Sequence, residues 1–414
     1  MHAILVAIGS AGDVHPFVGL GLQLAARGHR VTLLASGYFE KLARQAGFDF
    51  VPVFSADEFL ALLKNPRAWH RFRGFIECFR GGVLPTIEPT YRAIADRYVP
   101  GETVVVASTL GIGARCAQER LGVPLVSVHL SPSVFRSDYQ NPVLPGMFLP
   151  DWLPGPLKRS QYWLADTLVI EPLLRGPLNE FRRSIGLPPV KGILSQWHNS
   201  PHGVLGLFPS WFAAQQPDWP AQTVLAGFPL YDERGLSPFD EDLVAFLDSG
   251  GPPIVFTPGS AMLHGREFFQ AAAEACVLLG RRGILLTRFP EQVRRALPAC
   301  VRHFSYAPFS ELLPRAAALV HHGGIGTLSQ GFAAGLPQLV MPMSFDQPDN
   351  AARLRRLGAG ASLPRKRFRG ATVAAALAEL LNSSQVAARC RQLAERLAAE
   401  RPLETACDLI EGLA

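Results

Sequence analysis

The segment with the clearest chemistry spans residues 320–328 and reads Val-His-His-Gly-Gly-Ile-Gly-Thr-Leu. An apolar strand at 316–320 ends in two histidines, and small residues then open a helix. Glycines let the backbone approach a ligand closely, and the unpaired N–H groups and positive dipole of a helix start attract an anion. A histidine adds a donor that can neutralise the charge of a leaving group. We therefore predict a diphosphate site, whereas a tight glycine turn beside a core histidine would be purely structural.

Polar residues with a different use follow the next predicted strand. Asp346 and Gln347 offer a carboxylate and an amide, the groups that hold neighbouring sugar hydroxyls. Upstream, Tyr306 and Ala307 lie just before the helix that precedes the histidine strand. Their ring and backbone are placed to frame a nucleotide base, so this half of the chain is predicted to bind a sugar nucleotide.

A second glycine turn, at residues 9–16, follows the first predicted strand. Its spacing is Gly-x-x-Gly, and Ala-Ser-Gly at 35–37 ends the second strand where a nicotinamide site would place an acidic residue, so a dehydrogenase is disfavoured. The turn carries Asp13, a carboxylate at the mouth of the helix that is either a helix cap or a candidate functional group. His15 is the other titratable candidate of this turn.

Acidic residues at two further places are expected to start helices. Asp240-Glu241-Asp242 contains the Asp-x-Asp pattern of metal-dependent sugar transfer, but it precedes a predicted helix at 240–247 whose dipole it complements. Asp349 is likewise placed to cap a helix at 350–357. We therefore predict no metal site.

The two glycine turns occupy matching places in a repeated strand–turn–helix–strand pattern. The ranges are 3–8, 16–27 and 31–34 in the first half, and 254–257, 265–280 and 284–287 in the second. Such units build parallel sheets that present ligands at the carboxyl ends of their strands. The sequence therefore predicts an α/β fold with two Rossmann-like, doubly wound parallel-sheet domains.

The domain boundaries follow from a change of pattern near residue 230. We expect an N-terminal domain at 1–228, a linker at 229–235 and a C-terminal domain at 236–395. A last helical stretch covers 385–413, and its end, 396–414, is expected to pack on either domain, including back on the N-terminal one.

The composition restricts the class of protein. The 414 residues are 48% hydrophobic and 18% charged, which excludes a disordered chain, and no uncharged apolar run of about 18 residues predicts a membrane span. Six scattered cysteines without zinc spacing predict a reduced, cytoplasmic protein. The net charge is +6, but the basic stretch at 353–369 lacks interleaved aromatics. We therefore expect a solvated surface and no nucleic-acid partner, with an anionic membrane surface or substrate left open.

Two segments rich in aromatic residues interrupt the α/β pattern. Residues 54–80 contain Phe54, Phe59, Trp69, Phe72, Phe75 and Phe79, and residues 132–163 contain Phe135, Tyr139, Phe148, Trp152, Tyr162 and Trp163. Packing of insertion loops explains each ring singly, but both segments flank one strand edge. We therefore predict an apolar pocket wall. Its candidate contacts are Ser10, Phe75, Phe79, Ser108 and His129.

The Asp13 turn, the His-His-Gly-Gly-x-Gly-Thr motif and the Asp-Gln pair together resemble the GT-B glycosyltransferases of family 1, which include the macrolide, glycopeptide and sterol glycosyltransferases. The similarity extends over nearly the whole chain. Residues 8–14, 223–230 and 254–350 most closely resemble the catalytic chain of the bacterial rhamnosyltransferase that makes rhamnolipids. The resemblance implies two Rossmann-like domains facing across a cleft, the first binding an acceptor and the second a nucleotide sugar.

The resemblance also assigns roles by position. Asp13 matches the general base of bacterial members, with His15 as the alternative, while Ser108 stands where plant members have an aspartate that supports a histidine. His321, rather than His322, aligns with the phosphate-binding histidine. The implied donor-site residues are Ser260, Tyr306, Ala307, His321, Gly323, Gly324, Gly326 and Thr327 for the nucleotide and diphosphate, and Asp346 and Gln347 for the sugar.

The implied reaction is inverting and needs no cofactor or metal. A nucleotide-diphosphate sugar, which we expect to be dTDP-L-rhamnose, gives its hexose or 6-deoxyhexose to a lipophilic hydroxyl acceptor such as a 3-(3-hydroxyalkanoyloxy)alkanoate. The alternatives are a UDP-glucose-dependent glucosyltransferase acting on a sterol, polyketide or phenolic acceptor, and a nucleotide-sugar epimerase or binder. The rhamnolipid relative also suggests peripheral association with the inner membrane or a partner chain.

Overall fold

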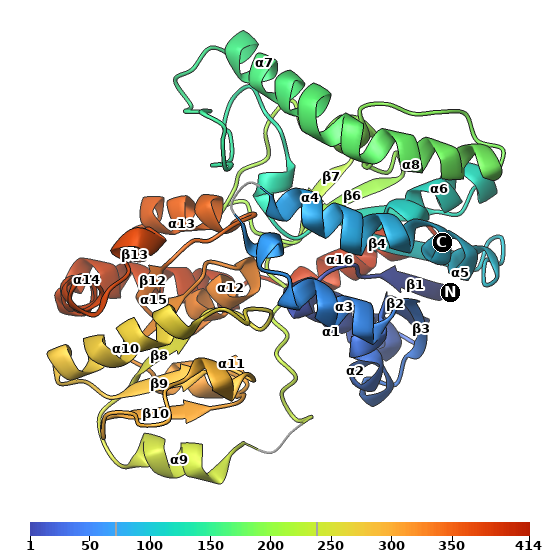
Figure 1. The fold of residues 1–414 in the computed structure, drawn as a ribbon. Coiled ribbons are helices and arrows are strands. Elements are labelled where there is room, and N and C mark those ends of the chain that lie inside the picture. The colour runs from blue at the N-terminus through green and yellow to red at the C-terminus, as the bar shows by residue number, and fades with distance from the viewer. Residues whose placement is uncertain (71–72, 237–238) are drawn as a thin grey trace. The chain divides into compact units, whose positions relative to one another are not determined.

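The computed structural model describes residues 1–70, 73–236 and 239–414, so Phe72 of the predicted aromatic wall lies outside the described residues. The chain divides into two compact units. Unit 1 comprises Met1–Pro229 and Arg401–Ala414, and unit 2 comprises Leu230–Glu400. Each unit contains one parallel sheet with helices packed around it (Figure 1). The predicted α/β class with two doubly wound domains is confirmed.

The described part of unit 1 forms a seven-stranded parallel sheet in the order β3-β2-β1-β4-β5-β6-β7. Its strands are β1 (His2–Val6), β2 (Arg30–Ser36), β3 (Asp49–Phe54), β4 (Thr103–Ser108), β5 (Leu125–His129), β6 (Gly203–Gly206) and β7 (Thr223–Leu225). The central strand β4 is buried along its whole length, as expected for a parallel sheet covered on both faces. The strand order reverses between β1 and β4, and the candidate turn at 9–16 follows β1.

Helices of unit 1 cover this sheet and extend beyond it. They are α1 (Ala11–Ala26), α2 (Glu40–Gln45), α3 (Ala56–Lys64), α4 (Gly74–Cys78), α5 (Ile87–Ala95), α6 (Ile112–Leu121), α7 (Gly155–Ala165), α8 (Glu171–Ser184) and α16 (Pro402–Glu411). The prediction that the first helix starts at residue 16 is wrong by one and a half turns. Ser10 and Asp13 bond to each other across the first turn and start the helix at Ala11, with Pro16 inside it.

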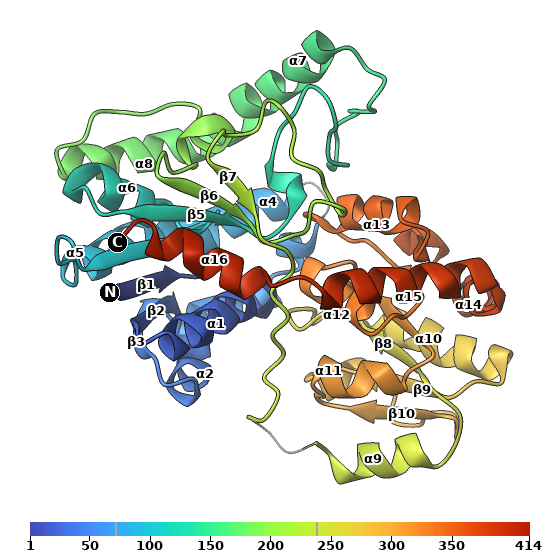
Figure 2. The same cartoon turned by 180° about the vertical axis from the view of Figure 1, so that it is seen from behind.

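The predicted single helical stretch at 385–413 is two helices. α15 (Ser384–Ala398) belongs to unit 2, and α16 begins at Pro402, which is a favourable first helical residue but cannot continue a preceding helix. α16 packs against α1 in unit 1 (Figure 2). The contact is fixed by Arg27, which donates to Asp408 and Glu411 at 2.6 and 2.7 Å.

The described part of unit 2 forms a six-stranded parallel sheet in the order β10-β9-β8-β11-β12-β13, which again reverses beside its first strand. Its strands are β8 (Ile254–Thr257), β9 (Gly283–Leu286), β10 (Val301–Phe304), β11 (Ala318–His321), β12 (Gln338–Val340) and β13 (Gly360–Ser362). Its other helices are α9 (Glu241–Asp248), α10 (Arg266–Leu279), α11 (Phe309–Leu312), α12 (Ile325–Ala333), α13 (Gln347–Arg356) and α14 (Gly370–Asn382).

The structure also bears on the cysteines, on membrane-spanning helices and on the basic stretch. All six cysteines are free thiols. Within the described ranges, no helix has the length and apolar character needed to cross a membrane. The basic stretch at 353–369 is exposed as predicted except at Arg353, whose guanidinium is buried and donates to Asp349 at 2.7 Å.

Candidate active site

The predicted site residues gather at the carboxyl ends of strands, where each sheet reverses its order. In unit 1, β1 leads into the Asp13 turn, and the neighbouring strand β4 ends at Ser108. In unit 2, β8 leads into the Ser260 loop, and the neighbouring strand β11 leads into the glycine motif. Loops diverge at such a reversal and leave room for a ligand.

The Asp13 turn depends on a glycine at position 9. Gly9 has a φ of +139°, and a Cβ there would collide with the Asp13 carboxylate, so no other residue fits. Asp13 Oδ2 accepts from the Ser10 N–H at 2.7 Å and from Ser10 Oγ at 3.1 Å. The carboxylate therefore caps α1, which is the structural role that the sequence analysis considered for Asp13.

Capping does not exclude a catalytic role for Asp13. Burial raises the pKa of its carboxyl group, while the hydrogen bonds from Ser10 oppose that rise. A carboxylate with a raised pKa is a stronger base than an exposed one. His15 follows two residues later in the same helix, where side chains two positions apart point in nearly opposite directions. The structure therefore does not bring Asp13 and His15 onto one helix face.

Two of the predicted acceptor-side groups lie near Asp13. The Ser108 hydroxyl accepts from the N–H of Ile8 at 3.3 Å and thereby joins the ends of β4 and β1. Burial and then the charge of Asp13 raise the pKa of the Cys78 thiol to about 11. Because this effect needs proximity, the end of α4 lies within electrostatic range of the Asp13 carboxylate. The rings of Phe75 and Phe79 contact each other there, with centroids 4.3 Å apart.

The prediction that His129 contacts an acceptor does not fit its surroundings. Its side chain is fully buried, with Nδ1 bonded to Thr109 Oγ1 and Nε2 to Asn199 Oδ1, both at 2.7 Å. Burial lowers the pKa of His129 to about 4, so the ring is neutral. His129 therefore supports the end of β5 and has no ring nitrogen left for a substrate.

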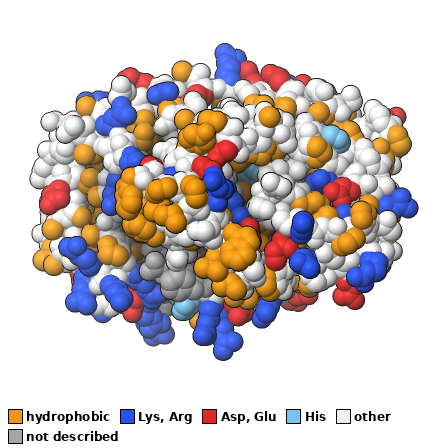
Figure 3. Space-filling view, turned by 90° about the horizontal axis from the view of Figure 1, so that it is seen from above, with side chains coloured by type: hydrophobic (Ala, Val, Ile, Leu, Met, Phe, Trp, Pro, Cys, Tyr) orange, Lys and Arg blue, Asp and Glu red, His pale blue; other side chains and the backbone are white. Residues whose placement is uncertain are grey.

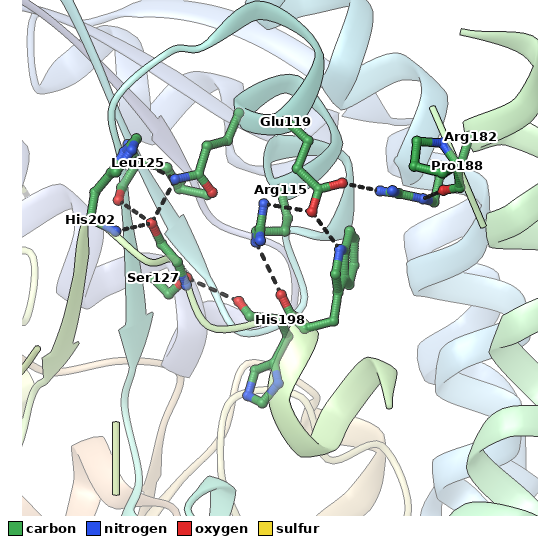
Figure 4. A network of polar contacts seen from close by, with 11 residues as sticks. Arg115, Glu119, Leu125, Ser127, Arg182, Pro188, His198 and His202 are labelled. Atoms are coloured by element: carbon green, nitrogen blue, oxygen red, sulfur yellow. Dashed lines mark hydrogen bonds and ion pairs between the residues drawn. The ribbon is translucent and has the colours of Figure 1, made fainter. Parts of the chain in front are cut away.

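A polar network holds the segment that carries Asn199 (Figure 4). Ser127 of β5 donates to the carbonyl of His198 at 3.0 Å and accepts from the N–H of Ser200 at 2.9 Å. On the other side of the segment, Arg115 donates to the carbonyl of Trp197 at 3.0 Å. Consecutive backbone groups of residues 197–200 are thus fixed from two sides, which positions Asn199 beside His129.

The aromatic wall predicted for residues 132–163 divides into buried and exposed rings. Phe135 and Tyr162 are buried, and Phe135 stacks on Trp219 with centroids 4.2 Å apart. The other four aromatic residues are exposed: Tyr139, Phe148, Trp152 and Trp163. Insertion-loop packing explains the first group. The second group stands at the surface of unit 1, and its role as an apolar pocket wall stays a prediction.

The glycine motif of unit 2 forms the predicted tight turn before α12. Gly323 has a φ of +96°, and a Cβ there would lie 2.7 Å from Val340 Cγ1. Gly324 occupies the N-cap position of α12 and has no side chain to cap it. The first N–H groups of a helix have no partner within it. An anion is therefore a suitable partner for the start of α12.

His321 supports this turn from inside. It is fully buried; its Nδ1 accepts from the Gly323 N–H at 3.1 Å, and its Nε2 lies 3.0 Å from Gln338 Oε1. Since Nδ1 accepts, Nε2 carries the proton and donates to Gln338. Burial lowers the pKa of His321 to about 3. Both ring nitrogens are occupied, so the predicted phosphate contact does not fit His321.

His322 is the histidine that faces the opposing loop. A Cβ added at Gly259 or at Gly324 would lie 2.7 or 2.5 Å from its ring, so the imidazole is held between the β8 loop and the start of α12. Its Nδ1 is buried and finds no hydrogen-bond partner in the described part of the chain. Burial lowers the pKa of His322 to about 4. Burial therefore favours a neutral ring, which can still form one hydrogen bond to a ligand at Nδ1.

Other predicted diphosphate residues belong to the two segments that hold this ring. Ser260 and Gly326 are exposed, and Thr327 is partly exposed in the first turn of α12. On the predicted nucleotide side, Ala307 is buried, while the Tyr306 hydroxyl donates to the carbonyl of Asp232. The guanidinium of Arg288 lies 4.7 Å from the centre of the Tyr306 ring. The Tyr306 ring is thus fixed at one edge and covered on one face.

The Asp346–Gln347 pair is only partly available for sugar hydroxyls. Gln347 is buried, and its Oε1 accepts from the N–H groups of Met343 and Ser344 at 2.8 and 3.1 Å. Its amide nitrogen is the group left for a ligand. Asp346 Oδ2 accepts from Asn350 Nδ2 at 2.7 Å, and the same nitrogen donates to the Gly323 carbonyl at 2.9 Å. Asn350, which the sequence analysis did not single out, therefore joins the sugar loop to the glycine turn.

The helix after this loop starts earlier than predicted. Asp346 occupies the N-cap position of α13, and Asp349 lies in its first turn, where it is fully buried and accepts from Arg353. The prediction that Asp349 caps a helix at 350–357 is therefore wrong. Phe345, immediately before the cap, has a φ of +57° and is 39% exposed. A bulky residue in this left-handed conformation is strained, and such strain concentrates at binding sites.

The acidic triplet at 240–242 behaves as predicted. Asp240 caps α9 by accepting from the N–H groups of Asp242 and Leu243 at 2.9 and 3.2 Å. Across residues 1–70, 73–236 and 239–414, no three histidine, cysteine, aspartate or glutamate side chains are grouped so that they could hold a metal ion.

Fold and site together describe a protein with two doubly wound units, one holding a carboxylate that caps α1 and the other a glycine turn before the uncapped start of α12. Residues 3–139 match the N-terminal domain of glycosyltransferase family 28, and residues 284–411 match the C-terminal domain of proteins like erythromycin biosynthesis protein CIII. The chain is 33% identical over 430 residues to O-mycaminosyltylonolide 6-deoxyallosyltransferase of Streptomyces fradiae, covering 99% of this chain and 97% of that one.

Further relatives agree with these matches. Vancomycin aglycone glucosyltransferase of Amycolatopsis orientalis is 30% identical over 369 residues, covering 87% of this chain and 85% of its own. Among solved structures, the glycotransferase of kitacinnamycin superposes with a TM-score of 0.75 at 22% identity, covering 100% and 99% of the two chains. The chain belongs to the GT-B glycosyltransferases of family 1. It is a nucleotide-sugar glycosyltransferase of the macrolide and glycopeptide type.

Proposed function

We propose that this glycosyltransferase transfers a 6-deoxyhexose, with inversion and without a metal ion, from a nucleoside diphosphate to the hydroxyl group of a lipophilic acceptor. The observation that carries the donor half is the buried, unpartnered Nδ1 of His322 beside the uncapped start of α12. A diphosphate would satisfy both and would be stabilised as it leaves by the helix dipole. Ser260 and Thr327 are further candidate contacts on the two sides of this ring.

Asp13 supplies the acceptor half of the proposal. Its carboxylate takes the proton of the acceptor hydroxyl as that oxygen attacks the anomeric carbon and the bond to the diphosphate breaks. Gly9 lets the backbone pass the carboxylate, and the two hydrogen bonds from Ser10 fix its orientation. Each unit therefore carries one half of the chemistry.

Relatives support the choice of a deoxysugar donor. O-mycaminosyltylonolide 6-deoxyallosyltransferase transfers a deoxyhexose, and a similar fold was solved as a spinosyn rhamnosyltransferase complexed with thymidine diphosphate. We propose dTDP-L-rhamnose as donor and a 3-(3-hydroxyalkanoyloxy)alkanoate as acceptor, with Phe75 and Phe79 near the acyl chains. UDP-glucose and a sterol, polyketide or phenolic acceptor form the second pair, and vancomycin aglycone glucosyltransferase supports the transfer of glucose in it.

Labelled donors test this proposal directly. The full chain is incubated with dTDP-rhamnose or UDP-glucose and either a hydroxy-fatty acid dimer or a macrolide aglycone. We expect rhamnose to appear on the acid dimer, with release of thymidine diphosphate. Transfer to the macrolide alone would reject the lipid acceptor, and an altered sugar nucleotide without transfer would identify an epimerase.

Alanine substitutions of the two adjacent histidines are expected to have different effects, one on nucleotide binding and the other on stability. His322→Ala should weaken thymidine diphosphate binding by roughly 10- to 100-fold, because it removes a hydrogen bond to a charged group, and should leave the thermal transition unchanged. His321→Ala should lower the stability of the fold by about 1–3 kcal/mol, because Gly323 and Gln338 lose their buried partner. Calorimetric titration and thermal unfolding measure the two effects. Normal diphosphate binding by His322→Ala would contradict the assignment.

A further inference from the structure

Exposed hydrophobic residues concentrate in one segment of unit 1. Among the described residues, 16 large hydrophobic side chains are exposed, and nine of them lie between positions 139 and 169. We call them the α7 patch: Tyr139, Val143, Phe148, Trp152, Leu157, Trp163, Leu164, Leu168 and Val169. They come from the loop before α7, from α7 itself and from the short π-helix η6 (Asp166–Ile170) that joins it to α8. Figure 3 looks onto the side that carries α7 and α8, and hydrophobic side chains gather there in clusters.

Polar groups beneath the α7 patch hold it in a defined shape. Lys158 is buried, and its Nζ donates to three backbone carbonyls, those of Asp138, Tyr139 and Asp151, at 2.9 to 3.1 Å. Gln161 exchanges two hydrogen bonds with the backbone of Phe148, at 2.8 and 2.6 Å. These bonds tie the loop to α7 at both ends of its course. A surface whose hydrophobic side chains stand on such a frame loses little freedom on binding.

Electrostatics favour a protein rather than an anionic lipid surface as the occupant. Residues 136–170 contain three basic and three acidic side chains. Arg136 forms a two-bonded ion pair with Asp166, and Arg159 pairs with Asp138. With Lys158 buried, no cation of this stretch is exposed and unpaired, although basic side chains beside the apolar face are what anionic membranes attract.

The size of the α7 patch matches a dimer interface. A whole aromatic side chain presents about 150–250 Å². Four of the nine patch residues are aromatic, and since all nine are only 40% to 74% exposed, together they present roughly 600–1,000 Å² of apolar surface. A monomer rarely exposes more than about 600 Å² in one patch, and a stable interface buries about 800 Å² on each partner. A patch without net charge can also face its own copy across a two-fold axis without repulsion.

We propose that the α7 patch is the contact surface of a two-fold symmetric dimer of this chain. In such a dimer each patch residue is used twice, so one substitution removes two sets of contacts. The two exposed tryptophans, Trp152 and Trp163, are the expected centres of the interface, because tryptophan dominates the binding energy of protein contacts. The proposal stands independently of the transferase reaction.

Sedimentation velocity of the full chain over a wide dilution series tests the dimer. The wild-type protein should sediment as a dimer that dissociates on dilution, and Leu168→Glu should raise the dissociation constant by about 100-fold or more. Leu278→Glu is the matched control, since Leu278 is exposed to 63% on α10 and Leu168 to 65% on η6. The control should sediment as the wild type does.

A second variant, Trp152→Ser, tests the dimer independently of Leu168, and vesicle flotation tests the lipid alternative. Trp152 lies 74% exposed in the loop, so its replacement cannot disturb the core and should weaken the dimer even if Leu168→Glu misfolds. A wild-type chain that is monomeric at all concentrations would overturn the proposal, as would a dimer unaffected by both substitutions. A monomer that floats with neutral phosphatidylcholine vesicles, and loses this with Trp152→Ser, would assign the α7 patch to lipid instead.

Discussion

Asp13→Asn is expected to slow sugar transfer by about 10²- to 10⁴-fold while nucleotide binding stays at the wild-type level. Asparagine keeps the shape of the side chain, and its carbonyl oxygen can accept the same bonds from the Ser10 N–H and hydroxyl. The turn should therefore remain folded, but the group can no longer take a proton. Single-turnover transfer and calorimetric titration of thymidine diphosphate separate the two effects.

His15→Ala provides the control for this substitution, because His15 lies in the same first turns of α1 on another face. It should retain most of the transfer rate. Full activity in Asp13→Asn together with a large loss in His15→Ala would move the general base to His15. Loss of nucleotide binding in Asp13→Asn would show instead that the substitution disturbs the fold rather than the proton transfer.

The pH dependence gives the same residue a second readout. Burial raises the pKa of Asp13, so the active, deprotonated form is lost as the pH falls through that raised pKa. Ser10→Ala removes the 3.1 Å hydroxyl bond that stabilises the carboxylate. The acid limb of the rate profile should then shift to higher pH, and a merely structural Asp13 would leave that limb in place.

The sequence was sufficient for the fold and for the location of both turns. Strands β1, β8 and their neighbours are continuous apolar runs, and glycines follow them where a parallel sheet must open for a ligand. The helix boundaries were less predictable, since capping by Asp13 starts α1 earlier than the apolar pattern indicates, and α13 starts at Gln347 with Pro348 in its first turn. Caps are local hydrogen bonds that a hydrophobic period does not report.

The choice between His321 and His322 could not be made from their types, because both residues are histidine and the chain leaves the strand between them. Gln338, which is fully buried, could have indicated which histidine points into the unit. A glutamine at the start of an apolar strand needs a buried partner, and in a parallel sheet β12 lies beside β11, which ends in His321. Asn350 was missed for a related reason: its two acceptors, Asp346 and the Gly323 carbonyl, come together only in the folded unit.

The aromatic segment at 132–163 shows where a composition argument stops. Aromatic residues in an irregular segment fit a substrate wall, a core or an intermolecular surface equally well. Exposure separates the core residues from the other two groups. Phe135 became core by stacking on Trp219. Trp152 remained at the surface, where Lys158 and Gln161 hold its loop from below, and Trp163 is exposed on α7.

Glu119→Gln is expected to lower the free energy of unfolding of unit 1 by about 3–5 kcal/mol, the largest stability effect expected of these substitutions. Glu119 forms an ion pair with Arg182, whose side chain is only 1% exposed, and also accepts from Trp197 Nε1 at 2.9 Å. Neutralising it leaves the buried guanidinium without a counter-charge from Glu119, with the carbonyl of Pro188 at 2.9 Å and the Trp197 ring, whose centre is 5.3 Å away, still beside it. Urea unfolding followed by tryptophan fluorescence measures the loss.

Two further variants distinguish an uncompensated buried charge from general loss of packing. In Glu119→Gln with Arg182→Met the guanidinium is absent and the glutamine still accepts from Trp197, so part of the lost stability should return. Glu88→Gln breaks an exposed pair with Arg92 in α5 and should cost less than about 0.5 kcal/mol. A double variant less stable than Glu119→Gln alone would show that Arg182 stabilises unit 1 by packing rather than through its ion pair. Because the same network fixes Trp197 and hence Asn199 beside His129, the single variant should also disturb the end of β5.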